Sequence, residues 1–126
     1  GDDDGALALG QYKQYFDKYG YEMHFIVNTK RPLTRTNDEL IEIAERIESA
    51  SRLKFTDIYN NTNLSDQTDE TTLFSGYDEI KMLSKKMGIV IKKNCGIDKA
   101  LSNVPTNLKD TVFRMNICIL RPWEIQ

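Results

Sequence analysis

Acidic side chains open this sequence and are its first candidates for chemistry. Asp2, Asp3 and Asp4 stand between Gly1 and Gly5. Three carboxylates this close cannot all stay ionised in a buried site without a cation, and the glycines let the backbone approach a ligand. The run therefore fits a loop that binds Mg²⁺-bound water or senses a terminal phosphate. Alternatively, it is an acidic end that caps the first helix, where negative charge interacts favourably with the helix dipole.

Asparagines follow two of the apolar segments. Asn28 comes after YEMHFIV, and Asn60 begins the run Asn60-Asn61-Thr62-Asn63. A carboxamide donates and accepts, which matches the donor and acceptor on the edge of adenine. Asparagine also tolerates the tight turn that leaves a strand. The turn alone explains an isolated Asn28, whereas the cluster that begins at Asn60 favours neither interpretation over the other.

Basic residues and nucleophiles offer weaker signals. Lys30, Arg31 and Arg35 form a basic loop that either contacts phosphate or is simply solvated. The sequence contains one histidine, His24, for which we predict a hydrogen-bonded core position within a strand. It contains neither a G-x-x-x-x-G-K-[ST] loop nor a G-x-G-x-x-G turn. We expect no catalysis from this chain alone.

Composition limits the class of protein. The 126 residues suffice for one domain, and 40% of them are hydrophobic, as in a globular protein. The net charge of −2, with both signs interspersed, gives no electrostatic footprint for nucleic acid or an anionic membrane. Two cysteines are too few for a disulfide framework, and no apolar run reaches the ~20 residues of a membrane span, so we expect a cytoplasmic protein. The chain lacks an initiator methionine, and we expect a piece of a longer protein.

Helical and strand-like segments alternate along the chain. Thr36 and Glu39 form a capping box at the start of a helix whose apolar stripe runs from Leu40 to Ile47. Gly76 falls inside a later predicted helix, which indicates a close contact at that point. The predicted helices span residues 6–19, 36–51 and 70–87, with a short helical piece at 99–103, and the predicted strands span 21–28, 53–60, 89–91 and 112–120.

This alternation predicts an α/β domain with a mainly parallel sheet, right-handed crossovers and flanking helices. Ligands of open parallel sheets bind beyond the carboxyl ends of the strands. We therefore expect the site in the loops at residues 28–35, 60–66 and 93–97.

Residues 52–63, RLKFTDIYNNTN, resemble the later half of ParA/MinD-type P-loop ATPases, a superfamily that includes the nitrogenase iron protein. Residues 25–32 resemble the strand and loop of such ATP-binding proteins, and residues 1–5 resemble the segment at the end of the family's D-x-x-G motif, with Gly1 as the glycine of that motif. The resemblance implies that Asn60 binds the adenine base, that Asn61 is also a nucleotide-binding residue, that the loop with Asn94 and Gly96 lines the ribose, and that Asp2 lies near the attacking water.

The resemblance also implies a setting for the chain. Residues 1–126 would be a single domain, the C-terminal portion of a larger nucleotide-binding domain, and part of a P-loop NTPase-like three-layer sandwich. ATP and Mg²⁺ would bind the parent protein, whose Walker A half lies upstream, and not this chain tightly. The partners expected are that upstream half and, through a free sheet edge, a second copy, with no nucleic acid and no membrane.

Two other classes of protein stay open. The chain is alternatively a nucleotide-free interaction module, with Trp123 and the last strand as its contact edge. A receiver-like or flavodoxin-like regulatory domain is a further alternative. It needs a phosphorylatable aspartate after an internal strand, and Asp57, which we place within a strand, is poorly positioned for that role.

Overall fold

The computed structural model describes residues 2–118 as alternating helices and strands. Two short 3-10 segments, Ser65–Gln67 and Thr106–Thr111, lie in the loops. The helices are α1 (Asp3–Gly10), α2 (Lys13–Tyr19), α3 (Asn37–Ser51) and α4 (Tyr77–Met87), and the strands are β1 (His24–Val27), β2 (Asp57–Asn60), β3 (Val90–Gly96) and β4 (Val112–Arg114).

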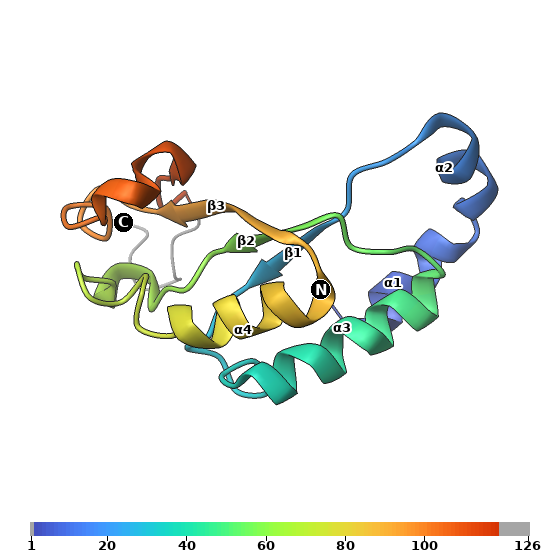
Figure 1. Cartoon of the computed structure of the whole chain (residues 1–126), viewed down its shortest axis with the longest axis horizontal. Coiled ribbons are helices and arrows are strands. Elements are labelled where there is room, and N and C mark those ends of the chain that lie inside the picture. Colours follow the sequence, from blue (N-terminus) through green and yellow to red (C-terminus); the bar gives the residue numbers. More distant parts are fainter. Residues whose placement is uncertain (1, 119–126) are drawn as a thin grey trace, which may run out of the picture.

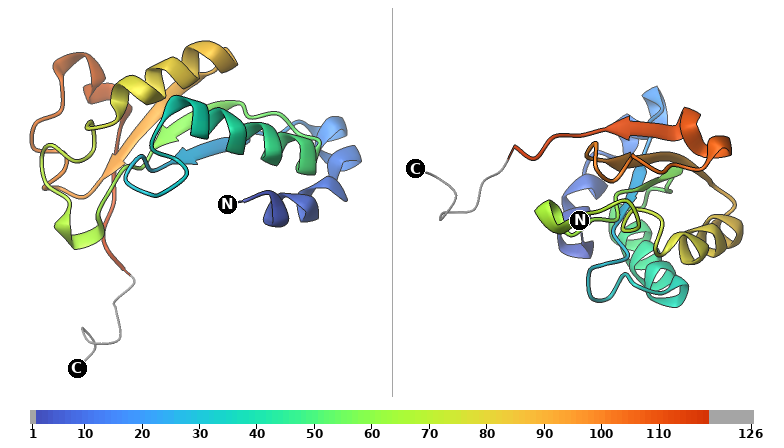
Figure 2. Two further views of the ribbon diagram at one scale, coloured as in Figure 1. Left: turned by 90° about the horizontal axis from the view of Figure 1, so that it is seen from below. Right: turned by 90° about the vertical axis from the view of Figure 1, so that its left-hand side faces the viewer.

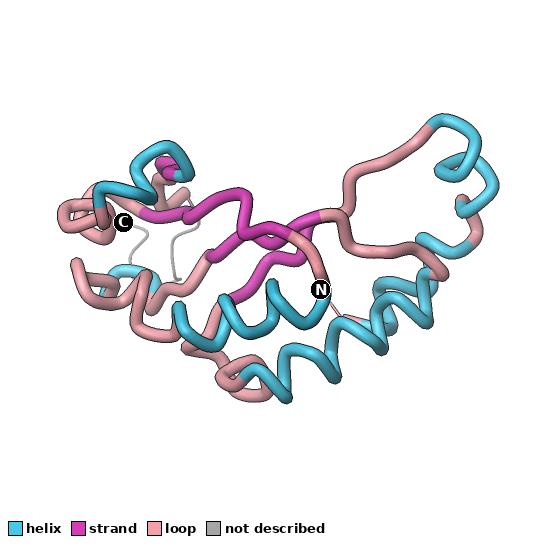
Figure 3. Tube along the Cα trace, in the orientation of Figure 1, coloured by secondary structure: helices cyan, strands magenta, loops and turns pink. Residues whose placement is uncertain are grey.

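The strands form one parallel sheet in the order β1-β2-β3-β4. Val27 pairs with Asn60, and Asn60 pairs with Asn94, so residues near the ends of three strands lie in a row. Because all strands run the same way, their carboxyl ends share one edge, on the left of Figure 1 and, as the ends of the magenta segments, in Figure 3. The predicted α/β class and parallel sheet are confirmed.

Helices α3 and α4 cover one face of this sheet (Figure 2). The predicted capping box begins α3, because Thr36 Oγ1 accepts from Glu39 N and Glu39 Oε1 accepts from Thr36 N. The predicted stripe packs on the strands, and the core it forms includes Leu40, Ala44, Ile47, Ile80 and Leu83 from the helices and Phe25, Val27 and Ile58 from the sheet.

The other face of the sheet is open within residues 2–118. Strand residues alternate between the two faces, so Ile26 and Val90 do not reach the core and are 53% and 65% exposed. The described chain therefore supplies two layers, the sheet and the helices on one side of it.

The N-terminal segment differs from the prediction. Instead of one helix over residues 6–19, α1 ends at Gly10 and α2 begins at Lys13. Arg52 Nη2 donates to Gly10 O at 2.6 Å, and this carbonyl would accept an amide hydrogen bond if the helix continued. Tyr12 and Tyr19 are exposed, and α2 buries no residue.

Other boundaries also differ, and β1 and β2 begin later than predicted, at His24 and Asp57. Residues 70–76 are turns, and α4 begins only after Gly76. A Cβ at Gly76 would lie 2.3 Å from Thr29 Oγ1, which confirms the expected close contact. Strand β3 continues to Gly96 rather than ending at Ile91, and residues 99–103 are turns rather than helix. Strand β4 ends at Arg114, and the last two residues of the predicted strand, 119 and 120, lie outside the described residues.

Candidate functional site

A pair of buried asparagines holds the ends of β2 and β3 together. Asn60 and Asn94 are both 0% exposed, and Asn60 Nδ2 donates to Asn94 Oδ1 at 3.0 Å. Asn60 Nδ2 also donates to Leu73 O at 2.9 Å, and Asn60 Oδ1 accepts from Thr62 N at 3.2 Å. Asn94 Nδ2 donates to Thr111 Oγ1 at 2.8 Å. The structure thus brings two of the predicted nucleotide-binding residues together. Their side-chain amides form hydrogen bonds with each other and with other groups of the protein.

Asn28 joins the loops that follow β1 and β2. Its Oδ1 accepts from Lys30 N at 2.9 Å and from Asn63 N at 3.2 Å, and its Nδ2 donates to Asn63 O at 3.2 Å. Next to this bridge, the buried hydroxyls of Thr29 and Thr62 share a hydrogen bond of 3.2 Å. These contacts hold the two loops in one arrangement.

Asn61 stands apart from this network. Its backbone N–H donates to Val27 O at 2.7 Å and so continues the ladder between β1 and β2. Its half-buried side chain makes no hydrogen bond to any residue in the described part of the chain. Asn61 also lines two cavities at the carboxyl edge. It is therefore the predicted residue with an amide group open to a ligand.

The first cavity, which we call the β1 cavity, measures about 510 Å³ and lies beside the carboxyl end of β1. No aspartate or glutamate of the described chain lines it. Its lining consists of three amides (Asn28, Asn61, Asn63), two cations (Lys30, Arg31), two hydroxyls (Thr34, Ser65) and four apolar residues (Phe25, Ile26, Ile43, Leu64). It therefore combines apolar contact area with amide donors and acceptors and with positive charge.

Strained backbone conformations occur in both loops around the β1 cavity. Leu33 and Ser65 have φ angles of 69° and 55°, in the left-handed region that L-residues rarely adopt. Asn63 Oδ1 accepts from Ser65 N at 3.1 Å and holds the second of these turns. Such strain persists only where surrounding contacts fix it, and it is found preferentially at functional sites.

The second cavity, the β3 cavity, measures about 310 Å³ and lies beyond the end of β3. It is lined by Asn61 and by Gly96, another predicted site residue, together with Cys95 and residues 115–118. A Cβ at Gly96 would lie 3.1 Å from Ala100 Cβ, so packing against the following turn explains this glycine. Burial raises the pKa of the Cys95 thiol, against a smaller opposite effect of Lys93, and this disfavours a thiolate nucleophile.

Asp2 lies away from the asparagine edge. It lines a cavity with His24, which is the first residue of β1 and so lies at the amino edge of the sheet. Asn60 is the last residue of β2 and lies at the opposite, carboxyl edge. Its Oδ1 accepts from Gly5 N at 2.9 Å, which caps α1 as the alternative interpretation of the acidic run expects. Gly1 lies outside the described residues.

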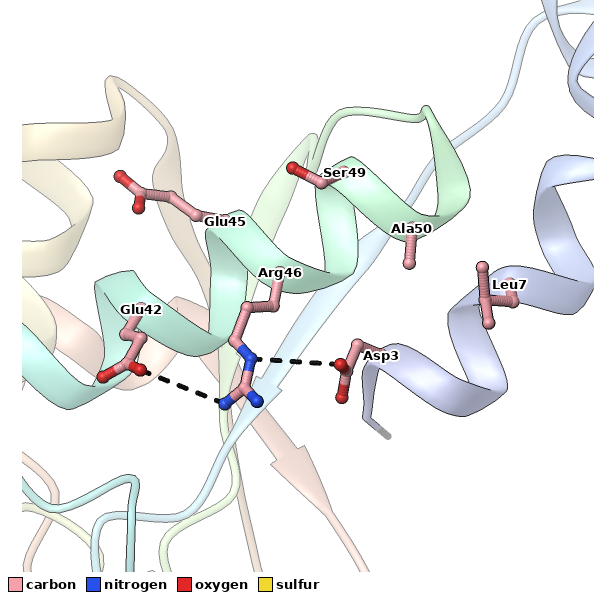
Figure 4. Close-up of a pocket in the computed structure, with 7 residues that line it drawn as sticks. All are labelled: Asp3, Leu7, Glu42, Glu45, Arg46, Ser49 and Ala50. Atoms are coloured by element: carbon pink, nitrogen blue, oxygen red, sulfur yellow. Dashed lines mark ion pairs between the residues drawn. The ribbon is translucent and has the colours of Figure 1, made fainter.

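The other aspartates of the run belong to α1 as well. Asp3 forms an ion pair with Arg46 of α3 at 3.9 Å, and Arg46 also contacts Glu42 at 4.0 Å (Figure 4). The hollow between α1 and α3 measures about 730 Å³ and is larger than the β1 and β3 cavities. Arg46, which lines this hollow, pairs with Asp3 and Glu42, which line it too. We therefore assign the hollow to the packing of α1 against α3 rather than to ligand binding.

His24 takes part in a polar cluster on the open face of the sheet. Its Nδ1 hydrogen-bonds Asp57 Oδ1 at 2.5 Å, and its ring stacks on Tyr59 with centroids 4.4 Å apart. The predicted hydrogen bonding of His24 is confirmed. The predicted core position within a strand is wrong, because the side chain is 30% exposed and the residue is the first of β1. Asp57 is the first residue of β2, far from the carboxyl edge that a receiver-like phosphorylation site needs. Lys92 lies nearby, and its pKa is raised by a hydrogen bond and the charge of Glu22.

The sequence placed Thr29, Thr62, Asn63 and Ser65 in the expected loops, but it did not predict the hydrogen bonds that join these loops. In the parallel pairing of β1 with β2, each residue lies opposite the residue 33 positions later, as Val27 lies opposite Asn60. The same offset places Thr29 opposite Thr62. The signal was therefore the repeated Asn-Thr step after each strand, at residues 28–29 and 61–62.

Comparison of the chain with models of protein families, with curated proteins and with solved structures finds no match in any of the three. Within residues 2–118, no three His, Cys, Asp or Glu side chains are grouped as a metal site would require. No helix of the described chain is both long and apolar enough to cross a bilayer.

Proposed function

We propose that this chain binds an adenine nucleotide in the β1 cavity, as the C-terminal part of a ParA/MinD-like ATP-binding protein. The observation that carries this proposal is the half-buried amide of Asn61, which has no hydrogen-bond partner among residues 2–118 and lines the cavity. Water reaches this amide in the free chain, because it is not among the buried groups without a partner, and a ligand with an adjacent donor and acceptor can replace that water.

The dimensions and lining of the cavity suit such a ligand. A volume of about 510 Å³ lies within the ~300–1,000 Å³ range of small-molecule sites. Ile26, Ile43 and Leu64 offer apolar area for a base, and Asn61 offers the polar edge. In this proposal Asn60 and Asn94 position the strand ends, and Gly96 shapes the neighbouring cavity.

The resemblance to ParA/MinD-like proteins supports the rest of the assignment. The phosphate loop and Mg²⁺ would come from an upstream half of the parent protein, and strands and helices of that half would complete a P-loop NTPase-like three-layer sandwich over the open face. The parent is then the ATPase, and the chain supplies no catalytic residue. Two free cysteines fit a reducing, cytoplasmic setting. A homodimer through the free edge of β1 is a further proposal.

Titration of the ¹⁵N-labelled chain with adenosine tests the proposal. We expect shift changes centred on the side-chain amides of Asn61 and Asn63, because these line the cavity. Asn61→Ala should raise the dissociation constant about tenfold, since one or two hydrogen bonds are lost. Asn103→Ala, at an exposed position in a separate turn, is the matched control and should change nothing. The absence of shift changes at the carboxyl edge at millimolar adenosine would refute base binding.

A nucleotide-free interaction module is the second candidate, favoured by one observation. Ile26 and Val90 are more than half exposed on the open sheet face, although parallel sheets are nearly always covered on both faces. This candidate predicts a protein partner whose binding is lost in Val90→Asp, with no response to adenosine. Trp123, proposed from the sequence as a contact residue, lies outside the described residues.

A further inference from the structure

We propose that Lys30 and Arg31 bind the α-phosphate of the nucleotide, the one next to the ribose, so that the β1 cavity holds both ends of a nucleoside monophosphate and the upstream half binds only the phosphates beyond it. This inference rests on the proposed function, because it places the anionic end of the same ligand. Both side chains line the cavity, and no carboxylate of the described chain does. Neither side chain forms an ion pair with any residue from 2 to 118.

The loop that carries these cations is held in place by its own hydrogen bonds. Asn28 Oδ1 accepts from Lys30 N at 2.9 Å, and Asn28 O accepts from Arg31 N at 3.3 Å. Thr34 Oγ1 donates to Asn28 O at 2.7 Å and closes the loop. The backbone positions of both cations are therefore fixed relative to the cavity, and ligand binding needs to order only their side chains. A preordered backbone lowers the entropic cost of binding.

The chemistry of the lining fits a phosphate rather than a neutral group. A guanidinium presents a planar pair of N–H donors to phosphate oxygens, and an ammonium adds a point charge. Ser65 adds a neutral donor from the opposite loop, because its hydroxyl makes no hydrogen bond within the described chain. Two cations without ion-pair partners and a hydroxyl without a hydrogen bond in the described chain thus line the same cavity as the amides and the apolar residues.

Comparing adenosine, adenosine monophosphate and inorganic phosphate in one titration series separates the two ends of the ligand. We expect the monophosphate to bind the chain about tenfold more tightly than adenosine, as two partly exposed charge-assisted contacts allow. In Lys30→Gln/Arg31→Gln the two affinities should become equal, while adenosine affinity stays unchanged. Lys85→Gln/Lys99→Gln removes the same charge at exposed positions elsewhere and should keep the tenfold ratio. Added salt should reduce the ratio, because screening weakens exposed charge contacts.

The outcomes distinguish this inference from the proposed function. Equal affinity of the unaltered chain for adenosine and its monophosphate overturns the phosphate assignment and leaves base binding standing. A tenfold ratio that survives in Lys30→Gln/Arg31→Gln also overturns it. Binding of monophosphate and of free phosphate with equal affinity, lost in that variant and without adenosine binding, supports the anion site and overturns the base. No binding of any of the three overturns both.

Discussion

Replacing Asn60 by alanine tests whether the buried amide pair is a structural element of the carboxyl edge. The change removes the partner of three groups inside the protein: Leu73 O, Asn94 Oδ1 and Thr62 N. Leu73 and Asn94 are 0% exposed and Thr62 is 1% exposed, so water does not readily replace the lost contacts. At about 1–3 kcal/mol for each unsatisfied group, with partial relaxation, we expect a loss of about 4 kcal/mol. That is a large part of the ~5–15 kcal/mol that stabilises a typical domain.

Replacing Asn94 by alanine should cost less, although the side chain is equally buried. Asn60 Nδ2 then loses one acceptor but keeps Leu73 O, and Thr111 Oγ1 loses a donor at a half-buried position. We expect a loss of about 2 kcal/mol. The double variant should lose about 1 kcal/mol less than the sum of the two single changes, because the Asn60–Asn94 bond is counted twice in that sum.

Urea unfolding followed by circular dichroism measures these differences, provided that the slope with denaturant is the same in all variants. A loss below about 1 kcal/mol for Asn60→Ala, or a loss for Asn94→Ala as large as that for Asn60→Ala, would contradict the reasoning. If Asn60→Ala instead left stability intact and abolished adenosine binding, Asn60 would be the base-contacting residue that the family resemblance implies.

Single contacts are the basis of three other predictions. Gly76→Ala should destabilise the chain by about 2 kcal/mol and lower its melting temperature, because the new methyl would lie 2.3 Å from the buried Thr29 Oγ1. Hydrogen bonds from the Thr71 hydroxyl and amide, with smaller contributions from the next residue, lower the pKa of Asp69 to about 2. The stabilisation from this carboxylate is therefore complete above its ordinary pKa of 3.8 and is lost as the pH falls through about 2. NMR titration of the Asp69 carboxyl carbon measures this pKa, and a value near 3.8 would contradict the prediction. Burial raises the pKa of the Cys95 thiol, so mass spectrometry after brief alkylation should find the exposed cysteine at position 118 modified first, and equal labelling of both would contradict this.

Local signals in the sequence predicted the parts of the fold that local interactions determine. The capping box at Thr36, the apolar stripe of α3 and the end of α4 at Gly88, with φ at 68°, each depend on residues within a few positions. The alternation of strands with these helices then predicted a parallel sheet correctly. Contacts between distant residues decided the rest. The break after Gly10 depends on Arg52, and the late start of α4 coincides with the approach of Thr29 to Gly76.

The sequence predicted where the candidate site lies better than which side chains face it. Three asparagine-bearing strand ends do lie along one edge, as expected, but Asp2 does not lie with them. Successive residues of a strand point to opposite faces, so the orientation of Asn60 and Asn61 depends on a register that one residue of slippage would invert. No local property of two adjacent asparagines identifies the one that faces the core.

The asparagines at this edge have two different roles, and this difference is the basis for the functional proposal. Asn28, Asn60, Asn63 and Asn94 all form hydrogen bonds with the protein, and these bonds fix the strand ends and the loops after them. Compared with an apolar core, which could join strand ends without desolvating amides, the network adds geometric definition rather than stability; removing one amide is nevertheless costly, because its partners stay buried. Such definition is useful where a neighbouring group must meet a ligand at a fixed position. Asn61, next to Asn60 in the chain and without a partner for its own amide within residues 2–118, is the group that this rigid edge positions.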